Sequence, residues 1–149
     1  MSWLIDTNVL LRLADEQSPE HGVAVRAVES LLARDVSVFI GAQVLVEFRV
    51  VATRPAEVNG LGWPVAATAE AISSLQDQFP LLNETPVVLD RWLELVRRCQ
   101  VCGKRAHDAR LAALLLVHGI RGLLTFNTAD FPPGWGVEAV HPEHLLELP

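Results

Sequence analysis

Four carboxylate side chains stand where a parallel α/β fold places its ligand sites. Asp6 directly follows the apolar residues 3–5, and Asp130 comes shortly after a later apolar segment. Glu47 and Asp108 lie within segments of helical spacing, and we expect both helices to enter from the carboxyl ends of the strands, where ligands bind in such folds. Each carboxylate taken singly also has an ordinary structural explanation, as a helix cap, a solvated helix flank or a turn residue. The four together predict one acidic cleft.

An acidic cleft of this kind predicts a divalent metal ion. Four carboxylates that converge without a cation repel one another and raise their own pKa values. Mg²⁺ or Mn²⁺ removes that repulsion, because both ions take oxygen ligands from carboxylates and waters. A metal-held water can attack a phosphodiester while the metal stabilises the leaving oxygen. The residues therefore indicate a metal site capable of phosphodiester hydrolysis.

The composition is that of a globular domain. Of 149 residues, 50% are hydrophobic and 20% are charged, so we expect a single domain over residues 1–149. The net charge of −6 argues against a strongly basic nucleic-acid binder, but not against an enzyme that reaches phosphates through a metal ion. Cys99 and Cys102 supply only half the ligands of a structural zinc site. No apolar run reaches the length of a bilayer span and none resembles an export signal, so we expect a cytoplasmic protein with no membrane partner.

The elements that position the carboxylates alternate between strands and helices. The predicted strands are short apolar or β-branched segments, at residues 3–5, 36–40, 123–126 and 137–140. The predicted helices show apolar residues at helical spacing, at residues 7–14, 19–34, 42–53, 64–79, 86–99 and 105–117. Alternation of this kind predicts right-handed crossovers and an α/β fold with a parallel sheet between two helical layers.

Local signals set several helix ends. Ser18 and Pro19 predict a helix start, with Ser18 as the N-cap and Pro19 at the first helical position. Gly103 is the predicted cap of the helix that begins at residue 86, and Gly119 is the predicted cap of the helix that carries Asp108.

The motifs around the carboxylates carry a resemblance to a known family. They are Ile5–Leu10, Val46–Phe48, His107–Ala113 and Leu124–Phe131, which follow in this order along nearly the whole chain. The sequence is similar to PIN-domain proteins, and specifically to the VapC-type ribonuclease toxins of bacterial toxin–antitoxin pairs. Residues 54–67 also resemble the middle of many toxin members.

That resemblance implies a three-layer α/β/α sandwich and metal-dependent endonucleolytic cleavage of RNA, with Mg²⁺ or Mn²⁺ as the cofactor. It implies a cognate antitoxin that silences the enzyme, and a homodimer. By the same resemblance, Asp6, Glu47, Asp108 and Asp130 match the acidic quartet that binds the metal and performs catalysis.

Three polar residues match supporting positions of the family. Asn8 matches a polar residue that supports the first aspartate, and Thr125 matches a polar residue beside the site. Asn127 is neutral at a position where the wider family often carries an acid.

Two other functions remain open from the sequence. A phosphatase or receiver-type domain would use Asp6 as the phosphoryl acceptor, but it would need an acid at the position of Asn8 and a lysine after a later strand. A non-catalytic PIN-like module that binds RNA or protein is the third reading, and the retention of all four acids argues against it.

Contact with an RNA substrate requires positive side chains around the acidic cleft. Arginine suits this role because its planar fork can donate two hydrogen bonds to one phosphate. The basic candidates close to the motifs are Arg12, Arg49, Arg54, Lys104, Arg105 and Arg110.

Overall fold

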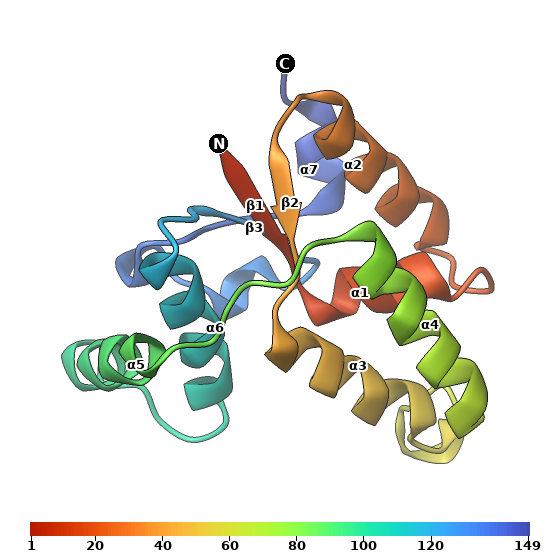
Figure 1. Cartoon of the computed structure of the whole chain (residues 1–149), viewed down its shortest axis with the longest axis horizontal. Coiled ribbons are helices and arrows are strands. Elements are labelled where there is room, and N and C mark those ends of the chain that lie inside the picture. Colours follow the sequence, from red (N-terminus) through yellow and green to blue (C-terminus); the bar gives the residue numbers. More distant parts are fainter.

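A four-stranded parallel sheet forms the centre of the protein, whose computed structural model describes residues 1–149 (Figure 1). The strands lie in the order β2-β1-β3-β4, so the first strand of the chain is central. Their bounds are β1 (Ser2–Ile5), β2 (Ser37–Phe39), β3 (Gly122–Leu124) and β4 (Glu138–Val140). Because all pairs are parallel, the carboxyl ends of the four strands share one edge of the sheet.

Seven helices flank the sheet. They are α1 (Thr7–Ala14), α2 (His21–Ala33), α3 (Ala42–Thr53), α4 (Val65–Gln78), α5 (Pro86–Arg98), α6 (Arg105–Val117) and α7 (Pro142–Glu147). Figure 1 shows α5 and α6 on one side of the sheet and α2 and α7 on the other, while α1 and α3 leave the carboxyl edge. Short 3₁₀ turns cover Ala56–Val58, Thr128–Asp130 and Pro133–Trp135. The predicted α/β fold with a parallel sheet between helical layers is confirmed.

One core of 35 buried apolar residues joins the sheet to its helices. Strand β1 supplies Leu4 and Ile5, which have no exposed surface, because a central strand of a parallel sheet is covered on both faces. Helix α6 is buried on all sides over Leu111–Leu115, which matches the continuous apolar sequence of that part of the helix. None of the helices is both long and apolar enough to span a lipid bilayer.

Two predicted helix boundaries are wrong. The second helix begins at His21 and not at Pro19, since the Ser18 hydroxyl accepts the backbone N–H of Glu20 at 3.2 Å and closes a separate turn before the helix. Helix α5 is not capped by Gly103, because Gln100 already takes a positive φ of 52° two residues after the helix ends.

Candidate active site

The four predicted carboxylates line a single cleft at the carboxyl edge of the sheet. Asp6 extends β1, Glu47 lies in α3, Asp108 in the first turn of α6, and Asp130 in the 3₁₀ turn after β3. The cleft has a volume of about 400 Å³ and is open to solvent. Four segments that are far apart in sequence therefore bring their acids to one place.

Asp6 is the most enclosed of these acids, with 8% of its surface exposed. Its Oδ1 accepts the backbone N–H of Thr7 at 2.8 Å, so the side chain caps α1 as well as facing the cleft. Its Oδ2 accepts the hydroxyl of Thr125 at 2.8 Å and the side-chain amide of Asn8 at 3.2 Å. Three donors thus fix the orientation of the Asp6 carboxylate.

Asn8 and Thr125 tie the ends of β1 and β3 together beneath the cleft. The Asn8 amide nitrogen also donates to Thr125 Oγ1 at 3.0 Å, and its carbonyl oxygen accepts the backbone N–H of Phe126 at 2.9 Å. Thr125 is fully buried, and its hydroxyl oxygen accepts the backbone N–H of Asn127 at 3.1 Å. The side chain of Asn127 itself is exposed and lines the cleft.

Thr7 holds a second acid of the cleft, a role that the sequence analysis does not predict for this residue. Its hydroxyl donates to Glu47 Oε2 at 2.8 Å and so joins the start of α1 to the middle of α3. The signal available in the sequence was its position, since the residue directly after Asp6 begins a helix at the edge where ligands bind.

Burial and the neighbouring negative charges raise the pKa values of two acids in the cleft. Burial raises the pKa of Asp6 to about 6; the hydrogen bonds from Thr125 and Thr7 oppose this rise, and the charges of Glu47 and Asp130 add to it. Burial also raises the pKa of Asp108 to about 6, with Asp130, Asp6 and Glu47 adding to the rise and Arg105 opposing it. Burial and the neighbouring negative charges therefore make ionisation of Asp6 and Asp108 more costly.

The donor set suits a hard divalent cation. All four side chains offer carboxylate oxygens, and the positive charge of an ion would lower the raised pKa values of Asp6 and Asp108. No three acidic, imidazole or thiol groups lie close enough together to ligate one ion in this structure. Asp6 and Glu47 each accept hydrogen bonds from the protein, so a metal ion would bind side chains that are already oriented.

Of the predicted basic residues, Arg12 reaches the cleft. Its Nη1 donates to the carbonyl oxygen of Asn8 at 3.2 Å, its Nε pairs with Glu20 at 3.3 Å, and its guanidinium lies over the Phe126 ring, 5.2 Å from the centroid. These contacts hold the cation beside the acids without placing it on any of them.

The other basic candidates lie outside the lining of the cleft. Arg105 donates to the carbonyl oxygen of Asp130 at 3.2 Å and packs over Trp135, so it holds the turn that carries an acid. Arg110 forms an ion pair with Glu84 at 3.0 Å. Arg49 and Lys104 are exposed.

Comparison with known proteins identifies the family. The profile of the PIN domain matches residues 3–132. Ribonuclease VapC24 of Mycobacterium tuberculosis is 30% identical over 128 residues, which cover 85% of this chain and 87% of the relative.

Solved structures share the fold over nearly the whole chain. VapBC2 from Rickettsia felis, bound to a DNA fragment from its promoter, has a TM-score of 0.70 at 14% identity and covers 95% of this chain and 98% of that one. VapBC-1 from nontypeable Haemophilus influenzae gives 0.67 at 16% identity, with 96% and 99% covered. A toxin–antitoxin complex from Klebsiella pneumoniae gives 0.61 at 24% identity, with 93% and 96% covered. The chain therefore belongs to the PIN-domain family and, within it, to the VapC-type ribonucleases.

Proposed function

We propose that this ribonuclease is a metal-dependent endonuclease that cleaves RNA in the cleft of Asp6, Glu47, Asp108 and Asp130, and that it is the toxin of a toxin–antitoxin pair. The observation that carries the proposal is the meeting of four carboxylates from four separate segments in one open cleft, with the pKa values of two of them raised. The identity to Ribonuclease VapC24 supports RNA as the substrate.

In this proposal the chain's residues orient ligands and hold the substrate. When bound, Mg²⁺ or Mn²⁺ would activate a water and stabilise the leaving oxygen. Thr125 and Asn8 hold Asp6, and Thr7 holds Glu47, so two carboxylates face the cleft in fixed orientations. Asp108 and Asp130 complete the donor set from the opposite helix and from the turn after β3.

Phosphate binding falls to the basic side chains at the rim. Arg12 lines the cleft and has Nη2 free to donate to a phosphate oxygen, because its hydrogen bonds to Glu20 and Asn8 use Nε and Nη1. Arg49, Lys104, Arg105 and Arg110 are further candidates on the surrounding surface. No lysine lines the cleft, so the alternative of a receiver-type phosphoryl acceptor gains no support.

The first experiment is cleavage of a mixed pool of structured and single-stranded RNA by the purified protein, with Mg²⁺, Mn²⁺ or EDTA. We expect metal-dependent cutting that falls by more than about 100-fold in Asp6→Asn and Asp108→Asn, because even the loss of a group that only hydrogen-bonds a metal ligand costs roughly 10–100-fold. Asp90→Asn, an exposed aspartate of α5, is the matched control and should cut as the wild type does.

Either of two results would overturn the assignment. Wild-type protein that is folded and cuts no RNA with either metal would contradict the ribonuclease proposal. Asp6→Asn and Asp108→Asn variants that both cut normally would contradict the site.

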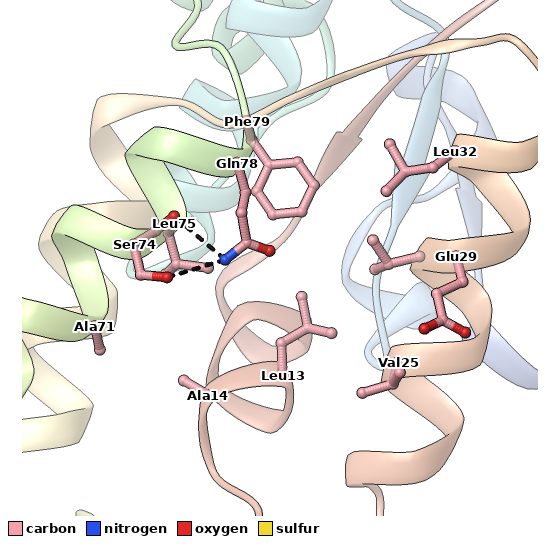
Figure 2. A pocket seen from close by; sticks show the side chains of 11 residues that line it. Leu13, Ala14, Val25, Glu29, Leu32, Ala71, Ser74, Leu75, Gln78 and Phe79 are labelled. Carbon is pink, nitrogen blue, oxygen red and sulfur yellow. Dashed lines mark hydrogen bonds between the residues drawn. The ribbon is translucent and has the colours of Figure 1, made fainter.

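The proposed antitoxin has a suitable surface in an apolar groove between α1, α2 and α4 (Figure 2). The groove has a volume of about 520 Å³, and eight of its eleven lining residues are hydrophobic, among them Leu13, Val25, Leu32 and Phe79. Helix α1 runs directly from this groove to the acidic cleft, since Leu13 and Ala14 line the groove and Arg12 lines the cleft. An antitoxin segment bound in the groove would have to extend along α1 to cover the carboxylates.

The structural neighbours described as toxin–antitoxin complexes imply an antitoxin partner, and the remaining features belong to the same proposal. They are a cytoplasmic location, a homodimer and a single PIN domain over residues 1–149. Co-expression with a candidate antitoxin, sought as a small reading frame next to the gene, tests the groove. We expect a stable complex that Leu32→Glu weakens by about 10-fold or more, with RNA cleavage by the free variant unchanged. Equal affinity of the variant and the wild type would contradict this surface.

A further inference from the structure

Gln43 joins the two helices that carry Glu47 and Asp108. It lies in the first turn of α3, four residues before Glu47, so the two side chains share one helix face. Its Nε2 donates to Glu47 Oε1 at 3.2 Å and to the backbone carbonyl oxygen of His107 at 2.8 Å. His107 is peptide-bonded to Asp108. One amide nitrogen therefore connects the carboxylate of one acid to the backbone beside another.

The orientation of the Gln43 amide is fixed by an ion pair behind it. Arg110 Nη1 donates to Gln43 Oε1 at 3.0 Å, and the Arg110 fork also donates to both carboxylate oxygens of Glu84, at 3.3 and 3.0 Å. A guanidinium can only donate, so the amide oxygen must face Arg110. The amide nitrogen must then face Glu47 and His107.

Glu47 is held from both sides by this arrangement. The Thr7 hydroxyl binds Oε2 at 2.8 Å, and Gln43 binds Oε1. A neutral amide performs the second task without adding charge to a cleft whose acids already raise the pKa values of Asp6 and Asp108. A glutamate at position 43 would add a negative charge, and it would lose both donated hydrogen bonds.

We propose that Gln43 is a positioning residue that sets the separation between Glu47 and Asp108 for metal binding, and that the Arg110–Glu84 pair acts through it by orienting its amide. This inference rests on the proposed function, because the two acids are its proposed metal ligands. Arg110 then serves the cleft through Gln43, while its guanidinium pairs with Glu84 outside the cleft lining.

The test measures Mn²⁺ affinity by calorimetric titration, together with kcat and KM for RNA cleavage, on the purified full chain. Gln43→Leu keeps the size of the side chain and removes its three hydrogen bonds. We expect Mn²⁺ affinity and kcat to fall by about 10–100-fold, as for other groups that orient a metal ligand, with KM for RNA changed less than threefold. Gln76→Leu, an exposed glutamine of α4, is the matched control and should match the wild type.

A second variant keeps the inference testable if Gln43→Leu fails to fold. Glu84→Ala removes the ion pair without touching either acid, and we expect a smaller loss of Mn²⁺ affinity, of roughly threefold. If Glu84 acts through Gln43, adding Glu84→Ala to Gln43→Leu produces no further loss, because the two changes break one chain of contacts. Additive losses in the double variant would overturn the role of the pair.

The outcomes separate this inference from the proposed function. Glu47→Gln is the reference variant, since it removes a proposed ligand directly. If Glu47→Gln loses Mn²⁺ and Gln43→Leu binds Mn²⁺ as the wild type does, the positioning role is wrong and the metal site stands. If the wild type and Glu47→Gln bind Mn²⁺ equally, the proposed metal site itself is wrong.

Discussion

Asp6 is the most enclosed acid of the cleft, and its surroundings determine whether its carboxyl group is charged. It is nearly buried, it accepts three hydrogen bonds, and it faces two other acids. Hydrogen bonds from Thr125 and Thr7 favour the charged form, but burial outweighs them and raises the pKa to about 6. In the metal-free protein, Asp6 therefore keeps its proton in a pH range where a free aspartate is already charged.

This raised pKa predicts how stability depends on pH in EDTA. Asp6 keeps its proton up to about pH 6 in the folded protein but only to about 3.8 in the unfolded chain, so the folded state binds more protons between these values. The free energy of unfolding then falls as pH rises through this window, by about 3 kcal/mol from this group. Urea unfolding of the wild type and of Asp6→Asn at pH 4 to 7 measures this contribution, as the difference between the two proteins in free energy of unfolding.

A bound cation should reverse that loss. With Mg²⁺ present, the charged form of Asp6 gains a partner, and we expect the wild type to recover most of its stability at pH 7. Asp6→Asn should lack the part of the pH-dependent loss of stability that Asp6 causes, and Mg²⁺ should stabilise it less than it stabilises the wild type. Parallel pH curves for the two proteins would contradict the assignment of the raised pKa to Asp6.

At this scale, the sequence predicts the acids better than the groups that hold them. Asp6, Glu47, Asp108 and Asp130 could be located because each follows a strand or lies on a helix that reaches the same edge. Thr7 and Gln43 were not assigned to the site, since their contacts depend on how α1, α3 and α6 pack. Gln43 has a local signal in its four-residue spacing from Glu47, but its contact with His107 spans 64 positions.

At the scale of elements, the pairing of β1 with β3 depends on a close approach between Trp3 and Gly122. These residues are register partners, and a Cβ added to Gly122 would lie 2.6 Å from Trp3 Cδ2. Trp3 is 6% exposed and belongs to the core, so its ring has little room to move. The strand end that carries Asp6 is thus set beside the strand end that carries Thr125 by a glycine.

We therefore expect Gly122→Ala to lower the free energy of unfolding by about 1–3 kcal/mol, as overpacking of a core does. Gly134→Ala is the control, because nothing lies within 4 Å of a Cβ there and its φ is not positive. Chemical denaturation of both variants measures the difference. Equal stabilities would mean that the Trp3 ring shifts without cost.

The elements themselves were predicted where local signals and packing agree. The helices at residues 42–53 and 105–117 have the predicted bounds, since an apolar face begins and ends with them. Gly119 closes the second of these with a φ of +68°, as expected. The predicted helix boundaries at Pro19 and Gly103 are wrong because nearby residues form other turns. Ser18 closes a turn before the second helix, and Gln100 takes a positive φ before Gly103 is reached.

At the scale of the whole molecule, charge limits how the protein holds RNA. The chain carries 12 basic against 18 acidic residues, and only Arg12 among the basic ones lines the cleft, with Arg105 nearby. Association therefore draws on few basic side chains at the cleft itself, and we expect the metal ion to carry much of the attraction to phosphate.

We expect a correspondingly weak dependence of RNA affinity on salt. If Arg12 and Arg105 contact two phosphates, raising KCl from 50 to 200 mM at constant Mg²⁺ should weaken single-stranded RNA binding by roughly sevenfold. Fluorescence anisotropy with the inactive Asp108→Asn variant measures this without cleavage. A loss above about 100-fold would reveal an extended basic surface that includes Arg49 and Lys104.

The two ends of the chain lie at the edge of the sheet remote from the acids (Figure 1). Arg34, which ends α2, donates to the carbonyl oxygens of Leu145 and Leu148 at 3.2 and 3.0 Å and so fastens the terminal helix α7 there. Ser2 begins β1 at that same edge. A fluorescent or affinity fusion joined at either end would extend away from the cleft, so an immobilised enzyme keeps its face open to long RNA.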